Sequence, residues 1–183
     1  MTTRAWWFAV GITMAAVAGA TAVRAHRTSA AQPARLPAFV WIQPRSTVRD
    51  WTPASVAAAE RGIAEWNGID PSVSFVVTDD SADADVRVWW TDRFADAMSG
   101  ESRLEQGDDG RASSATVTLA VHHRDGRMLD TGEVRALTIH EFGHLLGLPH
   151  AADPASIMAP TVRVRTLSPR DSAALRSRAT AEP

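Results

Sequence analysis

The spacing of three histidines constrains the fold of this chain more than any other sequence feature. The stretch reads His140-Glu141-Phe142-Gly143-His144-Leu145-Leu146-Gly147-Leu148-Pro149-His150. In an α-helix, residues four apart lie about 40° apart around the axis and about 6 Å along it, so His140 and His144 share one face. Gly147 then predicts the end of the helix, because glycine adopts the left-handed backbone conformation without steric cost. The chain must therefore form a helix followed by a sharp turn that brings His150 back toward the first two histidines.

Three converging imidazoles predict a catalytic metal site. Neutral imidazole nitrogens are common zinc ligands, and three protein ligands leave one position of a tetrahedral ion open for water, whereas structural sites are closed. We therefore expect one Zn²⁺ held by His140, His144 and His150. Glu141 follows the first of these histidines directly, so its carboxylate lies beside the metal without binding it. It can accept a proton from metal-bound water, which predicts Glu141 as the general base.

The extended pattern HExxHxxGxxH is matched in full, and it resembles that of the metzincin metallopeptidases, in which a methionine turn follows. The corresponding turn in this chain reads Ser156-Ile157-Met158-Ala159-Pro160. Its distance from His150 and the later run Leu167-Ser168-Pro169-Arg170-Asp171 are most similar to the matrixin branch. The resemblance spans about residues 38–178, and its specific part is 131–171. It implies that Met158 forms a hydrophobic floor beneath the histidines and that Pro160 helps to wall the specificity pocket, beside the turn at Gly147.

The resemblance also implies a fold and an activity. The fold would be α+β, a twisted mixed sheet of five strands with two long helices and a C-terminal helix, the active-site helix lying at the back of a cleft. An antiparallel edge strand next to residues 115–121 would receive a peptide by strand addition. The implied activity is that of a zinc-dependent endopeptidase acting on peptides or proteins. Zinc-bound water would attack the scissile carbonyl, and Glu141 would pass the proton to the leaving amine.

Local sequence patterns predict the same elements independently. Short apolar runs bounded by turn residues predict five strands, at 38–42, 73–77, 85–90, 102–106 and 115–121. Helical spacing predicts helices over 50–68, from 130 or 131 onward, and from 168 through 175. Asp130 with Glu133 and Ser168 with Asp171 have the form of N-terminal capping boxes, and Thr52 precedes Pro53 as a further N-cap.

The N-terminal region predicts export. Arg4 precedes an uncharged apolar stretch over residues 5–23, which is typical of a signal peptide and is also nearly long enough to span a bilayer. We divide the chain into a signal peptide or membrane anchor (1–25), a linker (26–37) and one catalytic domain (38–183), because 183 residues with 45% hydrophobic content suit a single domain. We expect a monomer that is secreted, periplasmic or anchored outside the cytoplasmic membrane through residues 5–23.

Composition excludes several functions. The chain has no cysteine, which excludes disulfides, thiolate metal sites and the cysteine switch that keeps some matrixins latent. A net charge of -2 lacks the basic footprint of a nucleic-acid-binding protein. Several aspartates are available for calcium, but no spacing resembles a defined calcium loop, so Ca²⁺ is left open. His122 and His123 are adjacent on an extended segment and point oppositely, so we expect solvated loop histidines there and no second metal site.

Two other functions fit the same residues. The protein could be a zinc hydrolase of non-peptide amides, or a non-catalytic binding module that keeps the metal for stability. An intact Glu141 argues against the second alternative, because a purely structural metal site does not need a base.

Overall fold

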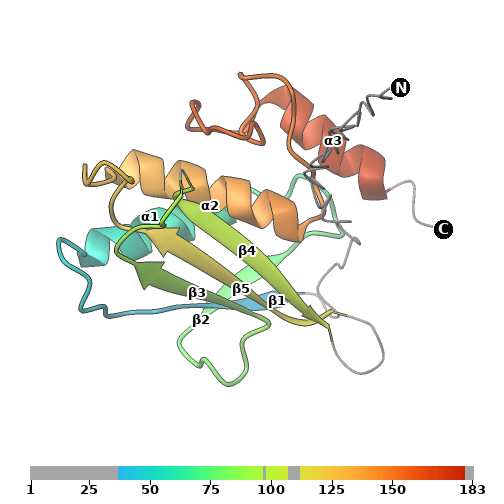
Figure 1. Ribbon diagram of the computed structural model, residues 1–183. Helices are drawn as coiled ribbons and strands as arrows, with labels where there is room; N and C mark the ends of the chain where they lie inside the picture. Colours follow the sequence, from blue (N-terminus) through green and yellow to red (C-terminus); the bar gives the residue numbers. More distant parts are fainter. Residues whose placement is uncertain (1–36, 97, 107–111, 180–183) are drawn as a thin grey trace, which may run out of the picture.

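The computed structural model describes residues 37–96, 98–106 and 112–179, drawn as ribbon in Figure 1. The predicted signal peptide or anchor, nearly all of the linker, and the turn at Asp108-Asp109-Gly110 lie outside these residues. Within the described ranges, no helix combines the length and apolar character that a bilayer crossing requires.

One mixed sheet contains every strand of the described chain. The strands are β1 (Ala38–Ile42), β2 (Phe75–Thr78), β3 (Val86–Thr91), β4 (Gly100–Gln106) and β5 (Ala112–Ala120). Their order is β2-β1-β3-β5-β4, with parallel pairing throughout except between β5 and β4. The expected five-stranded mixed sheet is therefore confirmed, and its antiparallel member β4 forms one edge.

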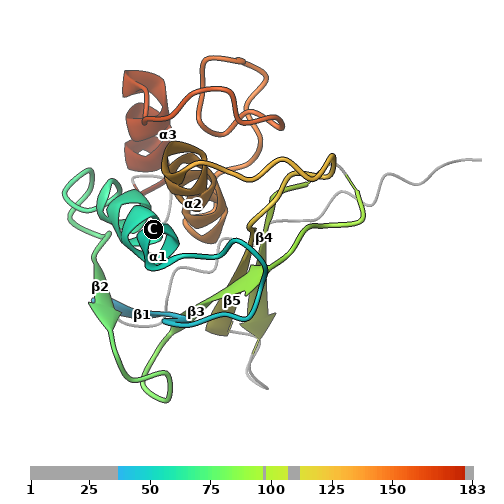
Figure 2. The same cartoon turned by 90° about the vertical axis from the view of Figure 1, so that its left-hand side faces the viewer.

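The helices α1 (Pro53–Ala64) and α2 (Thr131–Leu145) cover one face of the sheet. Figure 2 shows both helices above the strands, with the opposite face of the sheet left without a helix. Parallel neighbours cannot be joined by a hairpin, and α1 supplies the crossover between β1 and β2. The third helix, α3 (Pro169–Ala179), lies on the far side of α2 from the sheet (Figures 1 and 2).

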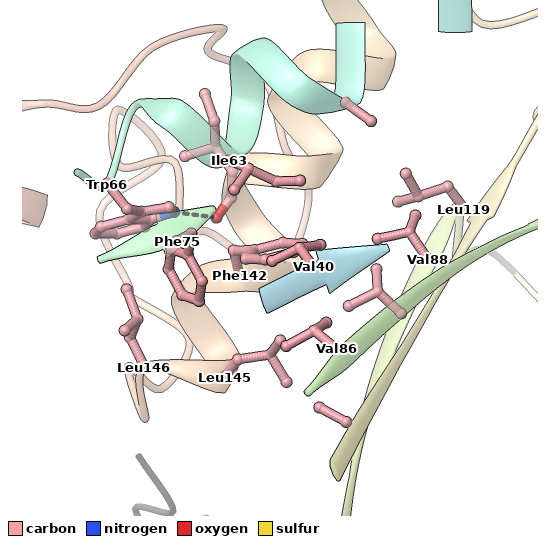
Figure 3. Packing of buried hydrophobic residues seen from close by; sticks show 14 of the residues in the cluster. Val40, Ile63, Trp66, Phe75, Val86, Val88, Leu119, Phe142, Leu145 and Leu146 are labelled. Atoms are coloured by element: carbon pink, nitrogen blue, oxygen red, sulfur yellow. Dashed lines mark hydrogen bonds between the residues drawn. The ribbon is translucent and has the colours of Figure 1, made fainter. Parts of the chain in front are cut away.

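The core lies between the sheet and the two long helices, and it fixes α2 in place. Fully buried valines from β1, β3 and β5 face Ile63 of α1 and Phe142 of α2 (Figure 3). Phe142 meets Phe75 edge to face, with ring centroids 5.1 Å apart. The buried indole of Trp66 donates to the Ile139 carbonyl over 3.0 Å, so its polar atom is satisfied (Figure 3). Because α2 is held at both Ile139 and Phe142, the residues between them have a fixed orientation.

Element boundaries differ from the predicted ones in specific places. The first helix runs from Pro53 to Ala64, whereas the predicted range was 50–68. Pro53 does lie in its first turn, but the Thr52 side chain makes no cap hydrogen bond. After Ala64, turns lead to Gly68, whose φ is 80°. The fourth strand begins at Gly100, two residues before the predicted start. This strand was difficult to delimit because an exposed edge strand lacks a regular apolar alternation.

Candidate metal centre

A reciprocal capping box starts α2, as the sequence predicts. The Asp130 carboxylate accepts from the Glu133 amide over 2.8 Å, and Glu133 accepts from the Asp130 amide over 2.9 Å. Arg165 donates to both oxygens of Asp130 at 2.8 Å and lowers the pKa of that carboxyl. Arg127 hydrogen-bonds Glu133 and is the main cause that lowers its pKa to about 2. These charged contacts set the start of the helix.

The other end of α2 brings three imidazoles together. The Nε2 atom of His144 lies 3.0 Å from Nε2 of His140 and 3.2 Å from Nε2 of His150. The three ligand atoms all lie within 4.8 Å of one another, so the residues form a group that can hold a metal ion. His140 is buried, His144 is half-buried and His150 is exposed. The group is thus open to solvent on the side of His150.

Backbone carbonyls fix the direction of two of these rings. Nδ1 of His140 donates to the Ile157 carbonyl over 2.8 Å, and Nδ1 of His144 donates to the Leu148 carbonyl over the same distance. A carbonyl only accepts, so each proton sits on Nδ1 and each Nε2 presents a lone pair to its neighbours. The Nε2 lone pairs of His140 and His144, 3.0 Å apart, repel each other unless a cation lies between them.

The donor set fits zinc. Nitrogen ligands about 2.1 Å from a tetrahedral ion lie about 3.4 Å from each other, close to the separations of 3.0 and 3.2 Å around His144. Burial lowers the pKa of His140 to about 4 and also lowers that of His144, so both rings are neutral at physiological pH. Neutral imidazole is the form that binds metal.

The turn at Gly147 returns the chain to the histidines. Gly147 has a φ of 79°, the left-handed value for which glycine was predicted. Its amide donates to the His144 carbonyl over 2.8 Å, and the Leu148 amide donates to the Gly143 carbonyl over 2.9 Å. A β-carbon at Gly147 would lie 2.7 Å from the Arg178 guanidinium, so α3 also packs directly on this turn. A larger residue would be strained here in both respects.

Met158 is buried against α2 and Pro160 lies at the surface, while the floor beneath the histidines that the resemblance implies for Met158 stays a prediction. The Met158 side chain is buried, and its sulfur contacts Gly143 so closely that a β-carbon there would collide with it. The Met158 carbonyl accepts from the Ala151 amide over 2.8 Å, which ties the two halves of the loop together. Pro160 is exposed. Its predicted role in a specificity pocket stays a prediction.

A buried carboxylate that the sequence marked only as a helix cap supports the centre. Asp171 is 3% exposed and accepts from the Ser156 hydroxyl, from the Ile157 amide at 3.3 Å and from the Ser168 amide at 2.8 Å. The Ile157 carbonyl is the group that orients His140. Asp171 therefore acts on the first histidine through one residue, Ile157, whose amide it accepts from and whose carbonyl orients His140. The sequence does not predict this role, because Asp171 is far from His140 along the chain. It predicts only the capping box that Asp171 forms with Ser168.

Glu141 is buried beside the three histidines. Its residue exposure is 5%, and burial is the main cause that raises its pKa to about 7. A hydrogen bond from the Ser102 hydroxyl opposes this shift, and the charge of Glu101 adds to it. A carboxyl whose pKa lies near neutrality is suited to accepting and returning a proton.

The prediction of solvated loop histidines is wrong for His122. This residue is 1% exposed, and its Nδ1 and Nε2 lie within hydrogen-bond distance of carboxylate oxygens, 2.8 Å from Asp92 and 3.0 Å from Asp50. Each nitrogen is already paired with a carboxylate, so neither faces a site where a metal could bind. His123 is partly exposed and lies near Glu133 and Arg127. No described residues outside the three histidines of α2 and its turn form a candidate metal group.

Comparison with known proteins agrees with this geometry. The family model for matrixins matches residues 47–177, which is more than half of the chain. A search of curated proteins found no match. The matched range contains α2, the turn at Gly147 and the methionine turn, and the family is one of zinc metallopeptidases. From the family match and the three-histidine group, we conclude that this chain belongs to the matrixin family.

Proposed function

We propose that the protein is an endopeptidase in which His140, His144 and His150 hold one zinc ion and Glu141 is the general base. The observation that carries the proposal is the convergence of three Nε2 atoms next to a buried carboxyl. A binding module that uses metal only for stability has no need of a carboxyl kept near neutral pKa by burial.

Zinc bound at this site supplies Lewis acidity toward water and toward the scissile carbonyl. The side chains have separate tasks. The Ile157 and Leu148 carbonyls keep the Nδ1 protons of His140 and His144 in place. Each Nε2 therefore stays unprotonated and can bind the metal. Glu141 accepts a proton from the attacking water on a carboxylate oxygen and gives it to the nitrogen of the leaving amine.

A peptide is the substrate that the sheet edge favours. The outer edge of β4 pairs with no other described strand, so an extended chain could add to the sheet there as a further strand. Strand addition recognises several consecutive backbone groups of a peptide, and a small amide has only one such group. The edge therefore favours peptides over the alternative substrates, the non-peptide amides.

The decisive experiment compares Glu141→Ala with the exposed Glu60→Ala on α1 in the full zinc-loaded chain. We expect Glu141→Ala to keep its zinc and to lose cleavage of a peptide library, while Glu60→Ala behaves as wild type. Undiminished cleavage by Glu141→Ala would refute the assigned base. Turnover of small amides by the wild type without any peptide cleavage would instead favour the non-peptide hydrolase.

We further propose that the protein acts outside the cytoplasm, as a monomer. The support is the apolar stretch at residues 5–23 behind Arg4, which serves either as a cleaved signal or as an anchor. N-terminal sequencing of the protein from fractionated cells distinguishes the two outcomes. Recovery of the intact chain in the cytoplasmic fraction would contradict the proposal.

A further inference from the structure

The carboxylate of Glu141 lies directly against the first residue of the edge strand β4. Gly100 is buried, and a β-carbon built on it would lie 2.6 Å from Oε1 of Glu141 and 3.1 Å from its carboxyl carbon. Real β-carbons do not approach other atoms so closely, so any larger residue at position 100 displaces the carboxylate. The absence of a side chain at Gly100 thus defines the space that Glu141 occupies.

Ser102 contacts the same carboxylate from the same side of the strand. Residues two apart in a strand point to the same face, so Ser102 and Gly100 both face α2, whereas Glu101 points away. Ser102 is half-buried, and its hydroxyl lies close enough to the Glu141 carboxylate to lower the pKa of that group. Gly100 therefore leaves the space, and Ser102 selects one orientation of the carboxylate within it.

We propose that Gly100 and Ser102 are positioning residues for Glu141, so that strand β4 sets the orientation of the general base. This inference rests on the proposed function, in which Glu141 is that base. The outer edge of β4 is also the edge proposed to pair with the peptide, since no described strand covers it. One strand then fixes both reaction partners, and the base is aligned with the scissile bond through a single rigid element.

A merely structural role for Ser102 predicts different behaviour. If its hydroxyl only satisfied a buried carboxylate, its removal would lower thermal stability and affect kcat and KM without distinction. If it orients the base, its removal lowers kcat and leaves substrate binding unchanged, because the interaction matters in the transition state.

The test uses the full chain loaded with zinc and a peptide substrate, and compares Ser102→Ala with Ser102→Thr, which keeps the hydroxyl. Ser114→Ala on β5 is the matched control, because the Ser114 hydroxyl also bonds a glutamate, Glu105, at 2.8 Å. We expect Ser102→Ala to lower kcat about tenfold, the effect of one hydrogen bond to a charged group. KM should stay within about twofold, and bound zinc and Tm should match those of Ser114→Ala.

Two further variants separate the possible failures. Ser102→Thr should restore most of kcat, and Gly100→Ala should lower kcat further, about 100-fold, because its methyl group displaces the base. If Glu141→Ala abolishes cleavage while Ser102→Ala and Gly100→Ala remain as active as Ser114→Ala, the positioning role is wrong and the proposed function stands. If Glu141→Ala remains active, the proposed function itself fails. The positioning role is also overturned if Ser102→Ala lowers kcat only when it also loses bound zinc or lowers Tm, and Ser102→Thr does not restore kcat.

Discussion

Two buried histidine sites in this protein use the same ring in opposite ways. At His122, both nitrogens lie at hydrogen-bond distance from carboxylates, one of Asp92 and one of Asp50. At His140, one nitrogen donates to the Ile157 carbonyl and the other faces two more imidazoles. Both residues are buried, so burial alone does not distinguish a ligand from a structural residue.

The partners of each ring determine what it can do. Two carboxylates occupy His122 completely, and the resulting contact joins three loops, before α1, after β3 and after β5. A single carbonyl leaves His140 with one free lone pair and holds the ring at a fixed angle. The first site stabilises the fold, and the second is available for a metal.

The largest expected effect comes from removing a ligand. His140→Ala should lose stoichiometric zinc and lower kcat/KM by at least about 1000-fold, because two imidazoles hold the ion poorly and leave it open to solvent. The measurement is metal content after dialysis together with peptide cleavage. His122→Ala is the matched comparison and should retain its zinc. Loss of zinc from both variants would mean that the two sites form one unit.

The next effect concerns stability at His122. His122→Ala leaves two carboxylates facing an emptied space and should lower the free energy of unfolding by about 3 kcal/mol. Urea denaturation in the presence of a chelator measures this without a contribution from zinc. His123→Ala, at the partly exposed neighbour, should cost much less. Equal losses for the two variants would contradict the structural role assigned to His122.

A smaller effect tests how His140 is oriented. Asp171→Asn keeps the size of the side chain but removes the charge that the Ile157 amide and the Ser156 hydroxyl contact. We expect zinc affinity to fall about tenfold, as for other groups that support a ligand from behind. Competition with a fluorescent zinc chelator measures it, with Asp153→Asn as the control for an exposed loop acid. Unchanged affinity would show that the Ile157 carbonyl keeps its place without Asp171.

The smallest effect is at the surface network beside His123. Hydrogen bonds from Arg127 lower the pKa of Glu133 from 4.5 to about 2, so the unfolded chain takes up the proton first as pH falls. The stabilisation is complete above pH 4.5 and disappears as pH falls toward 2. Solvent screens this pair, so we expect only about 1 kcal/mol. Stability curves of wild type and Glu133→Gln should converge at low pH, and a constant gap would contradict the assignment.

Sequence reasoning succeeded where the determining residues are close together in the chain. The capping box of Asp130 and Glu133, the helix that follows, and the left-handed turn at Gly147 all depend on neighbours within a few positions. The convergence of His140, His144 and His150 was predictable for the same reason, since helix geometry and one turn fix it.

Contacts between distant segments could not be predicted in this way. His122 meets Asp50 and Asp92 across separations of 72 and 30 residues, and nothing in the local pattern marks the pair. The contact of Gly100 with Glu141 is likewise between distant segments, and the start of β4 lay outside the predicted range because its exposed residues show no apolar alternation. Pairing partners, not propensities, define such an edge strand.

The dependence of His140 on Ile157 and Asp171 has a consequence for how the enzyme is made. The carbonyl that orients the first ligand, and the carboxylate that holds that carbonyl, both follow the histidines in sequence. A growing chain that has emerged only through His150 contains every ligand but lacks the support that aligns them. The ring of His140 therefore gains its full support only after synthesis has passed residue 171 and α3 has docked.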